Sequence, residues 1–234
     1  MKGRDSELDA VVLDFDGVIV NTEPLHFEAF REVLRPLGLA FSWEAYTSYY
    51  LGFDDRDAFR EAFKKGGRTV EDDVLHRLIG DKARAFRGFV EQRGVESYPG
   101  VLPLIRSLSG RVPIALCSGA LAGDIEPIIR KLDLGRVFDV VVTADDVEAS
   151  KPDPASYLLV LKRLAEAFPA RETRPRHCVA IEDTPAGIEA ASAAGLTVLA
   201  VCNSYGSEKL SAAARVVNSL RGITIRDLAA LTRG

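Results

Sequence analysis

Cysteine is scarce in this chain, which has three cysteines among 234 residues: Cys117, Cys178 and Cys202. Their number is odd and their spacing matches no motif of metal ligands, which argues against a metal site built from cysteine. Free cysteines of this kind are typical of a reducing compartment, where they behave as small apolar side chains. We therefore expect buried thiols and a cytoplasmic location.

An excess of basic residues is also absent, since 30 lysines and arginines stand against 34 aspartates and glutamates, giving a net charge of −4. The chain thus lacks the positive footprint of a nucleic-acid-binding protein. A small anionic substrate remains compatible with this composition, because a local site can be positive on an acidic protein. We expect a small-molecule partner and no nucleic acid.

Long apolar runs are missing as well. No stretch approaches the length of a membrane-spanning helix, and the polar segment from Met1 to Asp9 does not resemble a signal peptide. With 47% hydrophobic and 27% charged residues, the composition is that of a globular protein with a sizeable core. The length fits one large domain or a domain that carries an insertion.

A short apolar run, Val11 to Leu13, is followed by Asp14 and, after one residue, by Asp16. The run predicts a buried strand of a parallel sheet, and ligands of such sheets bind outside the carboxyl ends of the strands. Two acids at that end can bind a hard cation and take different roles in one reaction. From these residues alone an alternative remains open, in which one aspartate caps a turn and the other is solvated.

Residues 22–94 are interpreted as a helical insertion directly after this first strand. Thr22 can cap a helix that has Pro24 in its first turn. From there to Gly94 the sequence shows no strand pattern. The predicted breaks between helices fall at Gly52, Gly66–Gly67 and Gly80. We predict an all-helical domain over residues 22–94.

From Tyr98 onward, apolar runs alternate with amphipathic helices. The runs predict strands over residues 112–117, 138–142, 178–181 and 197–201, with helices over residues 125–132, 155–168 and 184–195 among them. Such alternation indicates an α/β fold, a parallel sheet with helices on both faces. Right-handed crossovers then place all the carboxyl ends of the strands on one edge. We predict a doubly wound, Rossmann-like core made of residues 1–21 and 95–234.

Two polar groups follow the middle strands at this edge. Ser118 comes directly after the second strand and suits a phosphate, together with the N–H groups of the helix that follows. Simple capping of that helix is the alternative. Lys151 precedes Pro152 at a predicted helix start, where a cation opposes the helix dipole. We interpret it as held there by another group, with a plain surface lysine as the alternative.

The fourth strand ends in Glu182 and Asp183, two adjacent acids whose repulsion a bound cation would remove. They can equally be partners of the dipole of the next helix. Mg²⁺ is usually held by one or two carboxylates together with waters and substrate phosphate. Asp14, Asp183 and Glu182, with the backbone carbonyl of Asp16, fit that description. Zinc is disfavoured because no cysteine or histidine lies near.

In combination, these motifs resemble the haloacid dehalogenase superfamily, and within it the subgroup of β-phosphoglucomutases and small sugar-phosphate phosphatases. The segments that carry the resemblance are Asp14-Phe15-Asp16-Gly17-Val18, Ser118, Lys151-Pro152-Asp153-Pro154 and Glu182-Asp183-Thr184-Pro185-Ala186-Gly187. The resemblance covers almost the whole chain. It implies that the helical insertion is the cap domain of that family, which closes over the substrate.

The resemblance also implies a chemistry, namely Mg²⁺-dependent hydrolysis of a small phosphorylated metabolite through an aspartyl-phosphate. Asp14 would attack phosphorus. Asp16 would protonate the leaving oxygen and then take a proton from the attacking water or hydroxyl. Ser118 and Lys151 would hold the phosphoryl oxygens.

Further site residues are implied in the same way. Glu182 and Asp183 would complete the magnesium site with Asp14 and Asp16. We also expect Gly119 and Ala120, which follow Ser118, to contact the substrate. The cap residues expected to contact the substrate are His26, Gly52, Phe53, Asp55 and Arg56.

Two reactions remain open within the family: hydrolysis of a sugar phosphate, and a phosphomutase reaction like that of β-phosphoglucomutase. His26 matches by position a cap-hinge histidine of those mutases, although a partly exposed helical histidine is an alternative. Leu51 and Asp55, however, stand where the mutases carry a lysine and an arginine, and Arg56 is close by. Because a mutase must grip a second phosphate, we rank hydrolysis first.

A phospho-aspartate receiver domain of a signalling protein is an alternative from another class. Such a domain is also doubly wound and also surrounds an aspartate with acids, a hydroxyl and a lysine. The helical insertion and the second acid Asp16 argue against it. No obligate protein partner is implied.

Overall fold

The computed structural model describes residues 8–51 and 53–233. The chain divides into two compact units, which we call the core unit (residues 1–21 and 97–234) and the helical unit (residues 22–96). The second boundary lies at residue 97, whereas the sequence predicts residue 95. The reason is that Ser97 forms a bridge with Val20, and the N–H of Tyr98 donates to the carbonyl of Ile19 at 2.9 Å.

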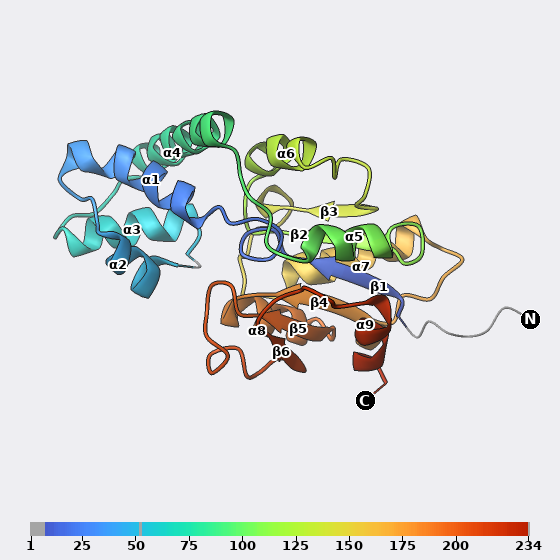
Figure 1. Cartoon of the computed structure of the whole chain (residues 1–234). Helices are drawn as coiled ribbons and strands as arrows, with labels where there is room; N and C mark the ends of the chain where they lie inside the picture. The colour runs from blue at the N-terminus through green and yellow to red at the C-terminus, as the bar shows by residue number, and fades with distance from the viewer. Residues whose placement is uncertain (1–7, 52, 234) are drawn as a thin grey trace, which may run out of the picture. The chain divides into compact units, whose positions relative to one another are not determined.

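Six parallel strands form the sheet of the core unit, in the order β3-β2-β1-β4-β5-β6 (Figure 1). The strands are β1 (Ala10–Leu13), β2 (Ile114–Cys117), β3 (Val140–Val142), β4 (Cys178–Glu182), β5 (Thr197–Val201) and β6 (Arg215–Val217). The strand β1 is central, with β2 and β4 as its neighbours. The predicted doubly wound parallel sheet is therefore confirmed, and the carboxyl ends of its strands share one edge.

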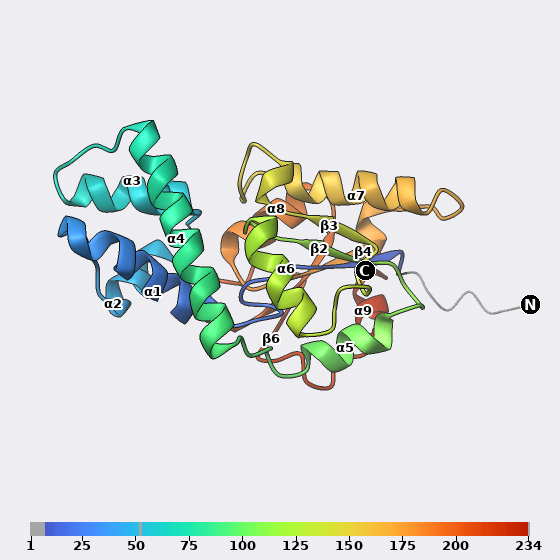
Figure 2. The ribbon, with the colours of Figure 1, turned by 90° about the horizontal axis from the view of Figure 1, so that it is seen from above.

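Helices cover both faces of this sheet. They are α5 (Val101–Leu108), α6 (Ala122–Lys131), α7 (Ala155–Ala167), α8 (Pro185–Ala193) and α9 (Ile225–Leu231), with short 3-10 turns η3 (Ala144–Asp146) and η4 (Pro175–His177). Figure 2 shows α7 and α8 on one face, and α5, α6 and α9 on the other. Side chains alternate accordingly: Ala10 and Val12 of β1 pack in one buried cluster with Val160 of α7 and Ile188 of α8.

The sequence pattern misses β6 and α9 and makes β3 too long. The strand β6 has three residues that are partly or fully exposed, so it carries no apolar run. Gly80 is also predicted wrongly as a helix break, because α4 (Asp72–Arg93) continues through it. A single glycine inside a helix costs only about 1 kcal/mol, which the tertiary packing of a 22-residue helix offsets.

The helical unit contains four α-helices and two shorter helical turns among its described residues. They are α1 (Glu23–Leu34), the 3-10 turn η1 (Arg35–Leu37), α2 (Trp43–Ala45), the π-helical turn η2 (Tyr46–Tyr50), α3 (Asp55–Lys65) and α4 (Asp72–Arg93). Both α1 and α3 pack on α4. Side chains from these helices, including Phe30, Leu34, Phe59 and Leu75, form a core that belongs to this unit alone.

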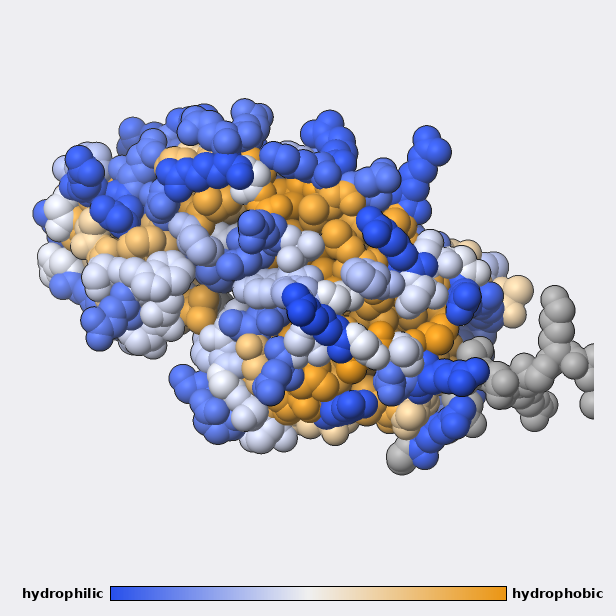
Figure 3. All heavy atoms as spheres, in the orientation of Figure 1, coloured by the Kyte–Doolittle hydropathy of each residue, from blue (hydrophilic) through white to orange (hydrophobic). Residues whose placement is uncertain are grey.

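The outer face of α4 is hydrophilic in Figure 3, as its sequence indicates. Asp72, Asp73, His76 and Arg77 are exposed, whereas Leu75 is buried, which is the pattern of an amphipathic helix against a core. Within residues 8–51 and 53–233, none of the helices has both the length and the apolar character needed to cross a membrane.

The core of the helical unit makes a stability prediction. Phe59 is fully buried and its ring meets that of Phe30 edge-on at 5.2 Å. Replacement of a buried phenylalanine by alanine typically costs about 3–5 kcal/mol, so Phe59→Ala should lower the free energy of unfolding by about that amount. Phe53→Ala, at a ring that is 41% exposed, should cost about 1 kcal/mol or less. Urea denaturation followed by circular dichroism measures both, and equal losses would contradict this packing.

Candidate active site

Asp14 follows β1 directly, at the centre of the carboxyl edge of the sheet. Its N–H donates to the carbonyl of Ile181 at 3.0 Å, which extends the pairing of β1 with β4 by one residue. The loop then turns sharply, since the N–H of Ile19 donates to the carbonyl of Phe15 at 2.8 Å. Asp14 is only 7% exposed, while Asp16 in the loop is partly exposed. The two acids of the first motif thus have different surroundings, as different roles require.

Lys151 reaches into this edge and donates to three acceptors. Its Nζ lies 2.6 Å from Oδ1 of Asp14, 2.7 Å from Oε1 of Glu182 and 3.1 Å from the carbonyl oxygen of Cys117. An ammonium group has three N–H donors, so this set uses all of them. The structure therefore favours the interpretation that Lys151 is held in place by other groups. It argues against the alternative of a plain surface lysine.

Glu182 is the second anchor of this lysine. It is 1% exposed, and its Oε1 also accepts the hydroxyl proton of Tyr157 at 2.6 Å. Its Oε2 accepts the backbone N–H of Asp183 at 3.2 Å. Burying a carboxylate costs free energy unless hydrogen-bond donors replace its water, and Glu182 has such donors on both oxygens.

A cation site is formed by Asp14, Glu182 and Asp183. Each offers a carboxylate oxygen, and these three atoms lie within 4.8 Å of one another. Gly17, at φ of +80°, leaves the space that Asp183 fills, because a Cβ at this position would overlap the Asp183 carboxylate. Three hard oxygen donors without nitrogen or sulfur suit Mg²⁺ and not zinc. The residues present therefore fit the predicted magnesium ion.

Ser118 lies at the end of β2 and is buried. Its Oγ accepts the N–H of Ala120 at 3.0 Å, within the turn that contains Gly119. The helix α6 begins only at Ala122, so the serine orders the turn and does not cap the helix. Its hydroxyl proton can still be donated to a phosphoryl oxygen, because the contact with Ala120 uses only a lone pair.

The clustered charges shift the ionisation of the site. The pKa of Asp14 is raised to about 8, chiefly by burial and also by the charge of Glu182, while Lys151 acts in the opposite direction. The pKa of Lys151 lies well above its ordinary value because Asp14 and Glu182 outweigh the effect of burial. A divalent cation would reverse the shift at Asp14, since it favours the ionised carboxylate.

The helical unit holds its own buried charge cluster, which the sequence does not predict. Lys82 of α4 is 2% exposed, and its Nζ lies 2.7 Å from Oδ1 of Asp55 and 2.8 Å from Nδ1 of His26. The His26 ring stacks on Phe86 with the ring centroids 4.1 Å apart. His26 and Asp55 are thus brought together within this unit, through a lysine far from both in sequence.

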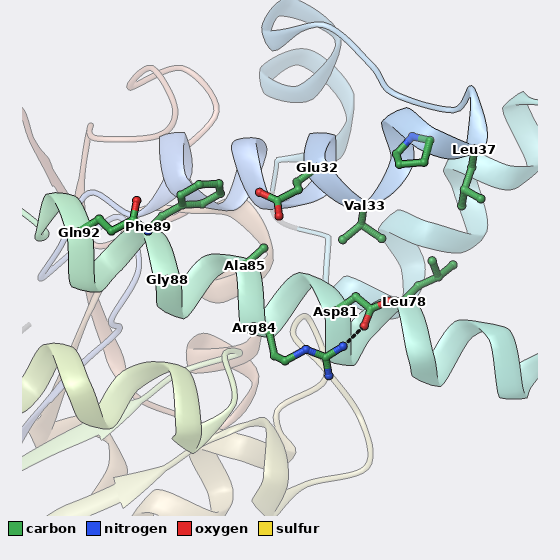
Figure 4. A pocket seen from close by; sticks show the side chains of 11 residues that line it. Glu32, Val33, Leu37, Leu78, Asp81, Arg84, Ala85, Gly88, Phe89 and Gln92 are labelled. Atoms are coloured by element: carbon green, nitrogen blue, oxygen red, sulfur yellow. Dashed lines mark hydrogen bonds and ion pairs between the residues drawn. The ribbon is translucent and has the colours of Figure 1, made fainter.

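The other predicted cap residues have no common site within the described part of this unit. Phe53 and Arg56 are exposed, and Gly52 lies outside the described residues. A pocket of about 680 Å³ opens between α1 and α4 (Figure 4), and none of the predicted residues lines it. Its arginine, Arg84, is already paired with Asp81. The pocket therefore brings together none of the predicted site residues.

Tyr157 and Asn203 are residues of the core site that sequence reasoning missed. Tyr157 lies in the first turn of α7, where its position matches an ordinary apolar helix pattern. Asn203 follows β5 and donates through Nδ2 to the carbonyl of Gly17 at 2.6 Å. The only signal for Asn203 is its place after a strand at the carboxyl edge, which many loop residues share.

The fold and this site together define an α/β enzyme with buried carboxylates and a lysine at the central strand end. Residues 8–195 match the family model of haloacid dehalogenase-like hydrolases, and the chain belongs to that family. The resemblance and the enzyme class predicted from the motifs are confirmed.

Curated relatives agree with this assignment. The chain is 32% identical over 193 residues to a Thermotoga maritima protein named phosphorylated carbohydrates phosphatase, which covers 81% of this chain and 82% of that one. It is 32% identical over 191 residues to fructose-1-phosphate phosphatase YqaB of Escherichia coli, covering 82% and 95%. The solved β-phosphoglucomutase of Clostridium difficile has a TM-score of 0.82 at 22% identity, covering 96% and 97%, which shows a shared fold.

The carboxylate cluster predicts a metal-binding effect. Asp183→Asn removes an ionised oxygen donor from a fully buried position and should weaken Mg²⁺ binding by about 10-fold or more. Calorimetric titration of the protein with Mg²⁺ measures this without turnover. Glu189→Gln is the matched control, because Glu189 is an exposed acid on α8. Equal Mg²⁺ affinity of the Asp183→Asn and wild-type proteins would show that the cluster is not the metal site.

The raised pKa of Asp14 predicts a pH effect on the metal-free protein. Because the folded-state pKa lies above the unfolded value, the folded state binds more protons between these values. The stability contribution of Asp14 is therefore present at low pH and is lost as pH rises through about 8. In EDTA, Asp14→Asn should match wild type in melting temperature only below about pH 4, exceed it increasingly as pH rises, and keep a constant excess above about pH 8. A constant difference between the two proteins from about pH 4 to about pH 8 would refute the shift.

Proposed function

We propose that this protein is a Mg²⁺-dependent phosphatase that removes phosphate from a small phosphorylated sugar through an aspartyl-phosphate on Asp14. The observation that carries the proposal is the ion pair between Lys151 and Asp14, with 2.6 Å between Nζ and Oδ1, beside the carboxylates of Glu182 and Asp183. A lysine ammonium beside a fixed carboxylate, at a sheet edge whose carboxylates can bind a metal ion, suits transfer of a phosphoryl group.

Asp14 is the nucleophile in this proposal. Its oxygen attacks phosphorus, the bond from phosphorus to the leaving oxygen breaks, and the aspartyl-phosphate forms. Lys151 places the attacking carboxylate and then attracts the phosphoryl oxygens, and Ser118 donates its hydroxyl proton to one of them. Both groups are already ordered by Cys117 and Ala120, so little reorganisation is needed.

Asp16 is the proposed acid and base. It protonates the leaving oxygen, then accepts a proton from the water that attacks phosphorus, which returns Asp14 to its free form. Its partial exposure gives it access to both groups. Mg²⁺, held by Asp14, Asp183 and Glu182 and the Asp16 carbonyl, would supply neutralisation of the phosphate charge.

The names of the relatives support a sugar phosphate as substrate, since two relatives at 32% identity are named for phosphorylated carbohydrates and fructose 1-phosphate. Membership of a hydrolase family also favours this reaction over a receiver domain, the signalling alternative.

A mutase reaction is less well supported by the helical unit. Leu51 and Asp55 stand where the mutase resemblance calls for cations, and Asp55 pairs with Lys82, the buried lysine of that unit. Arg60, close to Arg56 in sequence, pairs with Asp72 at 3.3 Å. Arg56 is exposed and is the cation next to Asp55 in sequence. Since neither Leu51 nor Asp55 supplies the cation that would grip a second phosphate, we place hydrolysis first.

The decisive experiment is a screen of phosphorylated sugars with Mg²⁺ that scores both phosphate release and isomer formation. We expect net phosphate release from at least one monophosphate, lost by several orders of magnitude in Asp14→Asn, as for other covalent nucleophiles. The aspartyl-phosphate should be trapped on wild type and absent from the variant. Conversion of β-glucose 1-phosphate to glucose 6-phosphate faster than phosphate release would favour the mutase. Turnover by a folded Asp14→Asn protein would rule out the mechanism.

A further inference from the structure

Tyr157 combines complete burial with a polar contact to the active site. Its ring lies in the cluster between the sheet and α7, among side chains such as Val12 and Val160. Its hydroxyl leaves that apolar cluster and donates to Oε1 of Glu182 at 2.6 Å. A phenylalanine would fill the same apolar space, so packing does not account for the hydroxyl.

The acceptor of this hydrogen bond is the atom that also holds the catalytic lysine. Oε1 of Glu182 receives both the hydroxyl of Tyr157 and, at 2.7 Å, the ammonium of Lys151. The Lys151 Nζ also lies 5.1 Å from the centroid of the Tyr157 ring, a cation–π distance. Tyr157 therefore contacts the lysine from one side and fixes its anchor from another.

Glu182 is only 1% exposed, so hydrogen-bond donors of the protein, and not water, hold its carboxylate in position. The other oxygen of Glu182, Oε2, accepts the backbone N–H of Asp183 at 3.2 Å and the hydroxyl of Thr184 at 3.5 Å. The phenol hydroxyl is the donor in this contact, because a carboxylate oxygen only accepts. Removing the hydroxyl would leave Lys151 as the sole donor to Oε1 within the described residues.

We infer that Tyr157 is a positioning residue, whose hydroxyl fixes the Glu182 carboxylate so that Lys151 is held against Asp14. The inference rests on the proposed function, because it concerns the lysine assigned there to the phosphoryl group. In a packing role only the ring of Tyr157 would be needed. In the positioning role the hydroxyl donor is needed as well, and its removal acts through Lys151.

The test begins with Tyr157→Phe, which keeps the ring and removes the donor. At saturating Mg²⁺ we expect kcat to fall about 10-fold and the affinity for inorganic phosphate to weaken, since supporting residues typically contribute 10–100-fold. Because Glu182 also belongs to the candidate metal site, Mg²⁺ affinity is titrated separately. Circular dichroism and melting establish folding at the assay temperature. Tyr49→Phe is the matched control: it removes a hydrogen bond from a tyrosine to Glu61, at 2.9 Å, on the surface of the helical unit.

Two further experiments distinguish a positioning role of Tyr157 from a purely structural role. In a Lys151→Ala background, Tyr157→Phe should no longer change the affinity for inorganic phosphate, measured by calorimetry, because the two residues act in series. Incorporation of 4-aminophenylalanine at position 157 restores an N–H donor on the same ring, and should recover kcat to within about threefold of wild type. This arm also applies if Tyr157→Phe does not fold.

Each outcome decides the inference. Wild-type kcat and phosphate affinity in folded Tyr157→Phe, an equal loss in the Lys151→Ala background, or no recovery with the N–H donor would overturn it. So would a weakened Mg²⁺ affinity with unchanged phosphate affinity, which would assign Tyr157 to the metal. A wild-type protein that hydrolyses no phosphomonoester would defeat the proposed function instead, while the phosphate titrations would still test Tyr157.

Discussion

The ammonium of Lys151 holds together groups that come from three neighbouring strands. Asp14 follows β1, the carbonyl of Cys117 ends β2, and Glu182 ends β4, and all three accept from one nitrogen. These strands are adjacent in the sheet, so a single cation at their common edge fixes the mutual position of segments that are far apart in sequence. The carboxylates of Asp14 and Glu182 are therefore oriented by this shared contact.

That contact does not balance the charge of the site. Asp14, Glu182 and Asp183 carry three negative charges when ionised and Lys151 carries one positive charge, which leaves 1 − 3 = −2. The pKa of Asp14 rises to about 8 because burial prevents water from screening this excess. A divalent cation would match the imbalance. The lysine alone therefore does not balance these buried acids.

Sequence patterns predict the fold and the motif residues of the site, but they do not predict which side chains from distant parts of the chain contact one another. The apolar run before Asp14 and the glycine after Asp16 indicate the strand end, and every later motif falls at the same edge, so the family and the parallel sheet follow from pattern. Tyr157 could not be found this way, because its hydroxyl points out of a regular apolar helix pattern. Lys82 is missed for a similar reason: its partners Asp55 and His26 lie 27 and 56 residues away, and helix periodicity carries no information about such pairs.

Lys82, which is buried, and Lys151, which is partly buried, both pair with carboxylates but in different charge environments. Lys82 is neutralised by Asp55, and its contact with Nδ1 of His26 requires that nitrogen to accept, which places the ring proton of a neutral His26 on Nε2. Its surroundings are completed by the rings of Phe30 and Phe86, at 4.9 and 5.5 Å, so it ties α1, α3 and α4 together within the helical unit. Lys151 instead faces more carboxylates than it can neutralise, beside a glycine that leaves space for Asp183. Lys151 leaves an excess of negative charge that a metal ion and a phosphate would balance, whereas Lys82 and Asp55 form a balanced pair. For this reason the proposed chemistry is placed at Lys151.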